Sequence, residues 1–231
     1  MNIKKISDLE KKIGYTFKNK NLIIEALTHR SFLNENPDFN LDHNERLEFL
    51  GDAVLELLIT EFLFKNYINS TEGEMTNYRA ALVKGENLAK VAKKINLESY
   101  LQMSRGEKND LLSKDYITSN AVESIIAAMY IDGGLEVVNV FLNKYIIVDL
   151  EDIIQNNLFV DSKSLLQEKM QEKFSITPSY KVMSQWGPDH SKTFEVAVFM
   201  NEIELARGIG SSKQKAEQQA AKILLELKYK N

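Results

Sequence analysis

Residues 44–55, with the sequence NERLEFLGDAVL, constrain the fold of this chain more than any other stretch. On an α-helix, where successive side chains turn by about 100°, Glu45, Glu48 and Asp52 lie within a band of about 60° on one edge. The opposite side of the same helix is apolar, with Leu47, Leu50, Val54, Leu57 and Leu58. Because such a stripe is stable only when it is buried against other elements, the stretch predicts a core-facing helix of a packed domain.

The acidic edge of this helix requires an explanation of its own. Like charges spaced by three and four residues repel each other by a few tenths of a kcal/mol per pair. A bound divalent cation would offset the repulsion, whereas a solvated acidic face would tolerate it, and spacing alone leaves both interpretations open. Gly51 lies in the same helix, where glycine costs up to about 1 kcal/mol relative to alanine. Its presence indicates that another group approaches the backbone closely.

The same twelve residues resemble the signature segment of the ribonuclease III family, which are endoribonucleases specific for double-stranded RNA. The resemblance continues in residues 27–32 (LTHRSF), 72–76 (EGEMT) and 79–80 (RA), and it extends over nearly the whole chain. It implies hydrolysis of phosphodiester bonds by a divalent-metal mechanism that leaves 5′-phosphate and 3′-hydroxyl ends with short 3′ overhangs. It also implies processing of ribosomal RNA precursors and structured messenger RNA.

The pattern of apolar residues changes along the chain. Glycine and proline are scarce in residues 1–150, and the apolar spacing there is helical, with helices expected at about 76–95 and 119–131 and a polar break at 105–115. Residues 151–161 are polar and acidic and are expected to form a linker. Residues 162–231 follow an α-β-β-β-α order, with strands expected at 179–185, 193–200 and 203–208. We therefore expect an all-α ribonuclease III catalytic and dimerisation domain, then an α+β domain resembling the double-stranded RNA-binding domain.

Composition and charge agree with this division. Residues 1–158 hold 18 basic against 24 acidic side chains, whereas residues 159–231 hold 11 against 9, so only the tail is mildly basic. The chain has no cysteine, which fits a reducing compartment, and no apolar run of about 18 residues. We expect a cytoplasmic protein with no membrane partner and no organic cofactor.

The resemblance also implies an active site of four side chains, two on each of two helices. By position these are Glu48 and Asp52 on the signature helix and Asn120 and Glu123 on a later one, with Mg²⁺ as the cofactor and Mn²⁺ as a substitute. Asp52 and Glu123 are the residues expected to be catalytic. Asn120 departs from the family pattern, which commonly has aspartate there. Its carbonyl can still ligate a hard cation, but the missing charge predicts weaker binding. The alternative is a double-stranded RNA-binding protein that no longer cleaves.

Other positions match the family outside these four. Glu45 and Glu72 correspond to acids near a second ion or the RNA, although an exposed loop acid would equally explain Glu72. Phe49 projects near the acidic edge and corresponds to an aromatic that inserts into the partner subunit of a homodimer. His29 is expected to pack and to donate or accept hydrogen bonds, because the three histidines of the chain form no recognisable acid–base pair.

The C-terminal domain has its own expected contacts with double-stranded RNA, which such domains read mainly by shape and 2′-hydroxyls. By resemblance, the first helix and the loop after the first strand each face a minor groove, and the start of the last helix meets phosphates. The residues implied are Ser164, Gln167, Glu168, His190, Ser212, Lys213, Gln214 and Lys215. Cations at a helix N-terminus oppose the helix dipole, so the two lysines indicate an anionic partner.

Overall fold

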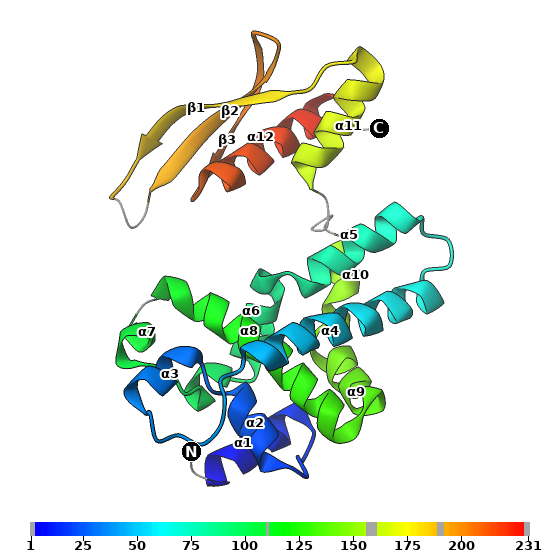
Figure 1. Cartoon of the computed structure of the whole chain (residues 1–231). Coiled ribbons are helices and arrows are strands. Elements are labelled where there is room, and N and C mark those ends of the chain that lie inside the picture. Colours follow the sequence, from blue (N-terminus) through cyan, green and yellow to red (C-terminus); the bar gives the residue numbers. More distant parts are fainter. Residues whose placement is uncertain (1–2, 110, 156–160, 189–191, 229–231) are drawn as a thin grey trace. The chain divides into compact units, whose positions relative to one another are not determined.

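The computed structural model describes residues 3–109, 111–155, 161–188 and 192–228. It divides the chain into two compact units, Met1–Phe159 and Val160–Asn231 (Figure 1). The first unit is helical in its described residues, and the second combines helices with a three-stranded antiparallel sheet. The predicted fold class is therefore confirmed. No helix among the described residues is long and apolar enough to cross a membrane.

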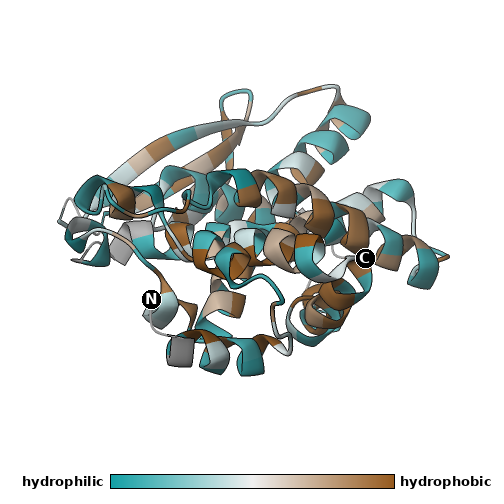
Figure 2. Ribbon diagram, turned by 60° about the horizontal axis from the view of Figure 1, so that its bottom comes forward, coloured by the Kyte–Doolittle hydropathy of each residue, from teal (hydrophilic) through white to brown (hydrophobic). Residues whose placement is uncertain are grey.

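The first unit is organised around two long helices, α4 (Glu45–Asn66) and α8 (Leu111–Gly133), which pack against each other. Hydrophobic residues gather where the helices of this unit meet, and hydrophilic ones lie along their outer sides (Figure 2). Leu55 and Ile59 of α4 and Ile125 and Ile126 of α8 are fully buried in this core. The remaining elements are α1 (Ile3–Ile13), α2 (Lys20–Ala26), α3 (Arg30–Glu35), α5 (Glu72–Val83), α6 (Gly85–Lys94), η1 (Leu97–Tyr100), α7 (Arg105–Asn109), α9 (Leu135–Tyr145), η2 (Ile147–Asp149) and α10 (Leu150–Gln155).

Two boundaries inside this unit differ from the predictions. The helix expected at 76–95 is divided into α5 and α6, because the backbone of Lys84 is extended, with ψ at 145°. The buried side chain of Asn87 donates to the carbonyl of Leu82 at 2.9 Å and holds this corner. The polar break expected at 105–115 contains α7 and the first turn of α8. Apolar periodicity could not reveal these turns, since their residues are mostly polar.

The expected linker, residues 151–161, begins too early in the prediction. Residues 151–155 belong to α10, and Ile153 is only 7% exposed in the core of the first unit. The two acidic residues that precede Ile153, Glu151 and Asp152, concealed its apolar contact. Residues 156–160 lie outside the described residues.

The second unit has the order α11 (Ser162–Phe174), β1 (Ser179–Trp186), β2 (Thr193–Met200), β3 (Ile203–Gly210) and α12 (Lys213–Lys228). The strands are adjacent in chain order, and Val196 of β2 lies opposite Val182 of β1 and Gly208 of β3. One core joins both helices to the sheet through Leu166, Met170, Val198, Ala220, Ala221 and Leu224. A Cβ at Gly208 would lie 2.2 Å from the amide nitrogen of Ala220, so this glycine permits α12 to lie directly on the sheet.

Candidate active site

Helices α4 and α8 are in backbone contact at Gly51. A Cβ at this position would lie 1.9 Å from the carbonyl oxygen of Glu123, closer than any side chain allows. The close approach that the sequence predicted is thus confirmed, and the group that approaches is the backbone of α8. The buried hydroxyl of Ser124 lies between two carbonyls, 2.9 Å from that of Asn120 in α8 and 3.3 Å from that of Asn44 at the start of α4, so the helices also meet there. This crossing brings the acidic edge of α4 beside the polar edge of α8.

The four residues expected in the active site come together at this crossing. Asn120 donates from Nδ2 to Oε1 of Glu48 at 2.8 Å, which links the two helices directly. Burial, followed by the negative charges of Asp52 and Glu48, raises the pKa of Glu123 to about 7. The carboxyl groups are therefore close enough to oppose one another's ionisation.

Burial and nearby negative charges also act on the carboxyl group of Glu48. Burial is the largest cause that raises its pKa, and the negative charges of Glu45 and Asp52 act in the same direction. The hydrogen bond from Asn120 favours the ionised form and opposes part of this shift. The site thus gathers negative charge, and the Asn120 amide partly compensates it at Glu48.

A pocket of about 310 Å³ opens beside this crossing. It is lined by His29, Arg30, Asn44, Glu45, Glu48, Glu107, Tyr116, Ile117 and Asn120, so it includes two of the four expected residues but neither Asp52 nor Glu123. The guanidinium of Arg30 lies 3.5 Å from the carboxylate of Glu45 at its edge. Sequence reasoning missed Glu107 because it lies in the polar segment expected to be a break. Arg30 lies in a segment that supported the resemblance, but it was given no role.

The donor chemistry of the crossing suits a hard cation. The side chains that meet there offer carboxylate and amide oxygens, which Mg²⁺ and Mn²⁺ accept as ligands. Among the described residues, however, no three Asp, Glu, His or Cys side chains stand in an arrangement that could hold a metal ion. Asn120 turns its nitrogen toward Glu48. To ligate a cation, its amide must turn over and release that hydrogen bond.

Other predicted residues lie around this site. Glu72 is exposed at the first turn of α5, where its carboxylate accepts the hydroxyl of Thr76 at 3.2 Å, and it does not line the pocket. His29 precedes α3 and accepts the amide of Ser31 at its Nδ1, in agreement with the expected hydrogen-bonding role. Phe49 is 83% exposed on the outer side of α4.

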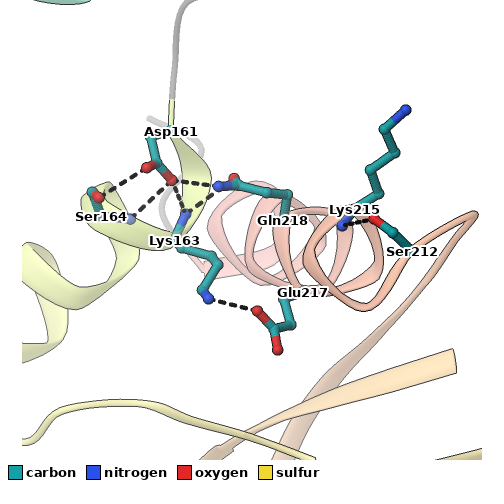
Figure 3. Close-up of polar contacts among 7 residues, drawn as sticks. All are labelled: Asp161, Lys163, Ser164, Ser212, Lys215, Glu217 and Gln218. Carbon is teal, nitrogen blue, oxygen red and sulfur yellow. Dashed lines mark hydrogen bonds and ion pairs between the residues drawn. The ribbon is translucent and has the colours of Figure 1, made fainter. Parts of the chain in front are cut away.

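In the second unit, the residues expected to contact RNA lie on the outer sides of α11 and at the start of α12. Ser164, Gln167 and Glu168 are exposed and share one face of α11. Lys213, Gln214 and Lys215 are exposed in the first turn of α12, and the hydroxyl of Ser212 accepts the amide of Lys215 at 3.2 Å (Figure 3). The side chain of Lys215 extends away from that contact. His190 lies outside the described residues.

Comparison with known proteins yields two family matches. Residues 19–150 match the ribonuclease-III-like family, and residues 162–228 match the double-stranded RNA binding motif. Ribonuclease 3 of Wolinella succinogenes is 44% identical over 223 residues, which cover 96% of this chain and 91% of the relative. Ribonuclease 3 of Nitratiruptor is 42% identical over 226 residues, which cover 97% of each.

Solved structures agree with the first match. The nuclease domain of ribonuclease III from Campylobacter jejuni is 40% identical to this chain, with a TM-score of 0.56. The match covers 62% of this chain and 94% of the Campylobacter jejuni chain. A second structure of the same domain, with a TM-score of 0.55, covers 61% of this chain and 94% of that chain. For that protein, structural flexibility is described in a region involved in dimer formation.

Proposed function

Because the chain belongs to the ribonuclease III family, we propose that it is an endoribonuclease that hydrolyses phosphodiester bonds of double-stranded RNA. The observation that carries the proposal is the presence of both parts in one chain. A helical unit with an acidic helix crossing precedes a unit that matches the double-stranded RNA binding motif. A cleavage-deficient binding protein, the alternative suggested by Asn120, finds no support among relatives that are named as ribonucleases over nearly the whole chain.

The proposed reaction requires a divalent cation, with Mg²⁺ as the physiological ion and Mn²⁺ as a substitute. Such an ion would activate water and stabilise charge on the attacking and leaving oxygens of the phosphodiester. The residues that would hold it are Glu48, Asp52, Asn120 and Glu123. The raised pKa of Glu123 supports this assignment, because a cation would relieve the repulsion that burial and the neighbouring carboxylates impose. Asn120 would contribute an oxygen without a charge, so affinity for the ion should be lower than with aspartate.

The remaining acids have less direct roles in this proposal. Glu45 lines the pocket next to Glu48, where it would face the RNA or a second ion. Glu107 lines the same pocket and joins this group. We propose the same role, contact with the RNA or a second ion, for Glu72, although it lies in the first turn of another helix, α5.

We also propose that the protein acts as a homodimer through the outer side of α4. Phe49, Leu57 and Phe64 are 83%, 56% and 74% exposed, so Leu57 does not belong to the buried stripe in which its spacing predicted it. At about 100° per residue the three side chains fall within about 80° of one another. Large apolar side chains on one helix face indicate an interaction surface. Sedimentation velocity should give a dimer, and Phe49→Glu should shift the protein toward the monomer. A monomeric wild-type protein at micromolar concentration contradicts this part of the proposal.

The decisive experiment is cleavage of a long, perfectly paired RNA by the purified protein. Parallel reactions contain Mg²⁺, Mn²⁺ or chelator, and a single-stranded RNA of the same composition serves as control. Cleavage of the duplex alone, only with a divalent ion, and with 5′-phosphates, 3′-hydroxyls and short 3′ overhangs, is the expected result. Tight duplex binding without cleavage under either ion would instead favour the binding protein.

The cellular role that we propose is cytoplasmic processing of ribosomal RNA precursors and structured messenger RNA. The absence of cysteine fits the reducing compartment that this role requires. Cells in which the gene is replaced by a Glu123→Gln version should accumulate unprocessed ribosomal precursor. Normal precursor levels in such cells would exclude this role without affecting the proposed chemistry.

A further inference from the structure

The carboxylate of Asp161 lies between the first turn of α11 and the side of α12 (Figure 3). Its Oδ1 accepts three hydrogen bonds, from the backbone amides of Lys163 at 3.0 Å and Ser164 at 3.2 Å and from Nε2 of Gln218 at 2.6 Å. Its Oδ2 accepts the hydroxyl of Ser164 at 3.0 Å. Since donors from two helices fix Oδ1, the position of Oδ2 beside Ser164 is fixed as well.

The pair of helices is held together at this point by further contacts. Nζ of Lys163 lies 2.6 Å from Oε2 of Glu217, and the amide of Lys163 donates to Oε1 of Gln218 at 3.4 Å. Gln218 therefore donates to α11 with one end of its side-chain amide and accepts from it with the other. This arrangement leaves the Asp161 carboxylate little freedom to rotate away from Ser164.

The chemistry of Asp161 determines where the proton of Ser164 lies. Partial burial alone would raise the pKa of Asp161, but hydrogen bonds from Gln218, Ser164 and Lys163 lower it below its usual value. The group is thus a carboxylate at neutral pH and has no proton to donate, so the Ser164 hydroxyl must be the donor in their contact. The remaining lone pairs of this exposed hydroxyl can only accept.

We propose that Asp161 is a positioning residue that presents the Ser164 hydroxyl as an acceptor for the 2′-hydroxyl of duplex RNA. The inference rests on the proposed function, in which Ser164 contacts a minor groove. A 2′-hydroxyl can donate to this acceptor, and DNA has none. The minor groove of an A·T pair offers only acceptors, N3 and O2, which an acceptor-only hydroxyl cannot bind. Asp161 therefore contributes to the discrimination of RNA from DNA without contacting either.

The test compares two duplexes that differ only in whether the 2′ position of the sugar can donate a hydrogen bond. Both have the same A·U sequence, which excludes the amino donor of guanine from the minor groove. One carries 2′-hydroxyls, and in the other fluorine replaces each of them, which preserves A-form geometry but removes the donor. Equilibrium binding of the full-length protein is measured in chelator, and the quantity of interest is the Kd for the fluorinated duplex divided by the Kd for RNA.

Asp161→Asn is the most informative variant. Its amide oxygen can still cap α11 and accept from Gln218, while its NH₂ group faces Ser164 and donates to the hydroxyl oxygen, so the hydroxyl proton turns outward. We expect the Kd ratio to fall by roughly two- to tenfold, the range for one hydrogen bond. Ser164→Ala should lower the ratio similarly, and adding Asp161→Asn to it should change the ratio no further. Glu202→Gln removes the same charge from the exposed β2–β3 turn and should leave the ratio unchanged.

Several outcomes would overturn the inference alone. One is a wild-type Kd ratio that Asp161→Asn does not change. Another is an equal fall of the ratio in the wild-type and Ser164→Ala backgrounds, because Asp161 would then act by another route. A third is an equal loss of affinity for both duplexes, which with a lowered Tm would show that Asp161 only stabilises the domain. If the wild-type protein binds neither duplex, the proposed RNA-binding function fails and the inference fails with it.

Discussion

The α4/α8 crossing and the α11/α12 contact hold their polar groups in opposite ways. At the crossing, burial and neighbouring carboxylates raise the pKa of Glu123 to about 7, and only the amide of Asn120 relieves Glu48. At the α11/α12 contact, hydrogen bonds from the neighbouring side chains and amides lower the pKa of Asp161. In the first region the carboxyl groups of Glu48, Asp52 and Glu123 oppose one another's ionisation, whereas in the second region hydrogen bonds from neighbouring groups stabilise the carboxylate of Asp161. We conclude that the first is suited to a cationic ligand and the second to a preorganised surface.

The largest effect is expected when one of the crowded carboxylates at the α4/α8 crossing is removed. Asp52→Asn and Glu123→Gln should each lower the cleavage rate of duplex RNA by about a thousandfold, because metal-based stabilisation of the transition state is worth several kcal/mol. Duplex binding in chelator should remain within about twofold, since the RNA-binding unit is unchanged. Single-turnover cleavage and a binding titration measure the two quantities. Cleavage at the wild-type rate in both variants would show that the catalytic residues lie elsewhere.

The second test separates the helix crossing from the charges that it carries. Gly51→Ala should lower the free energy of unfolding by about 2–3 kcal/mol, because the new methyl group overlaps the carbonyl of Glu123 and the helices must move apart. Denaturant unfolding measures the change. Gly73→Ala is a matched control in helix α5, since a Cβ there meets nothing within 4 Å. A loss of stability in the control as large as in Gly51→Ala would show that the crossing is not the cause.

The sequence predicted much of both regions, and the limits of those predictions are physical. Periodicity placed Glu48 and Asp52 on one edge of a helix, and the cost of a helical glycine indicated a close contact at Gly51. Neither pattern could show which group makes that contact, because the carbonyl of Glu123 is 72 residues away in sequence and the contact depends on tertiary packing. The same limit applies to Asp161, whose partner Gln218 lies on another helix.

Some features had no signal in the sequence at all. Glu107 lines the pocket from a polar segment that resembles any exposed loop. The hydrogen bond from Asn120 to Glu48 depends on the rotamers of two side chains, so residue identity could indicate a missing charge but not the amide that replaces it. The roles of Glu48 and Asn120 as metal ligands remain predictions.

The third test restores the charge that this chain lacks. Asn120→Asp should raise the apparent affinity for Mg²⁺ by roughly tenfold and keep or increase cleavage at low Mg²⁺, because the site gains a charged oxygen ligand. In chelator, the same variant should be less stable than the wild type, since the hydrogen bond to Glu48 is replaced by repulsion between two carboxylates. Mg²⁺ titrations of cleavage and thermal unfolding measure these effects. Reduced cleavage at every Mg²⁺ concentration would show that the amide itself is required.

The fourth test uses pH to measure how strongly burial and the neighbouring carboxylates oppose the ionisation of Glu123. The pKa of Glu123 is raised from 4.5 to about 7, so between these values the native protein retains a proton that the unfolded chain has released. Stability should therefore fall as pH rises from about 4.5 to 7, by about 1 kcal/mol once solvent screening is allowed for. Unfolding in chelator at both ends of this range measures the loss. Glu123→Gln cannot titrate and should flatten the profile, so an equal slope in wild type and variant would assign the effect to another group.

The smallest effect is expected in the RNA-binding unit, where the proposed partner of the basic side chains is the phosphate backbone of RNA. Lys213→Ala, in the first turn of α12, should weaken duplex binding severalfold, equally for all sequences. It should also reduce the slope of log affinity against log salt by about one, because one phosphate contact fewer releases one counterion fewer. Stability should not fall, since a cation at a helix N-terminus opposes the dipole. Lys222→Ala, exposed further along the same helix, is the matched control and should leave the slope unchanged. Equal slopes for wild type and Lys213→Ala would remove this residue from the RNA-binding surface.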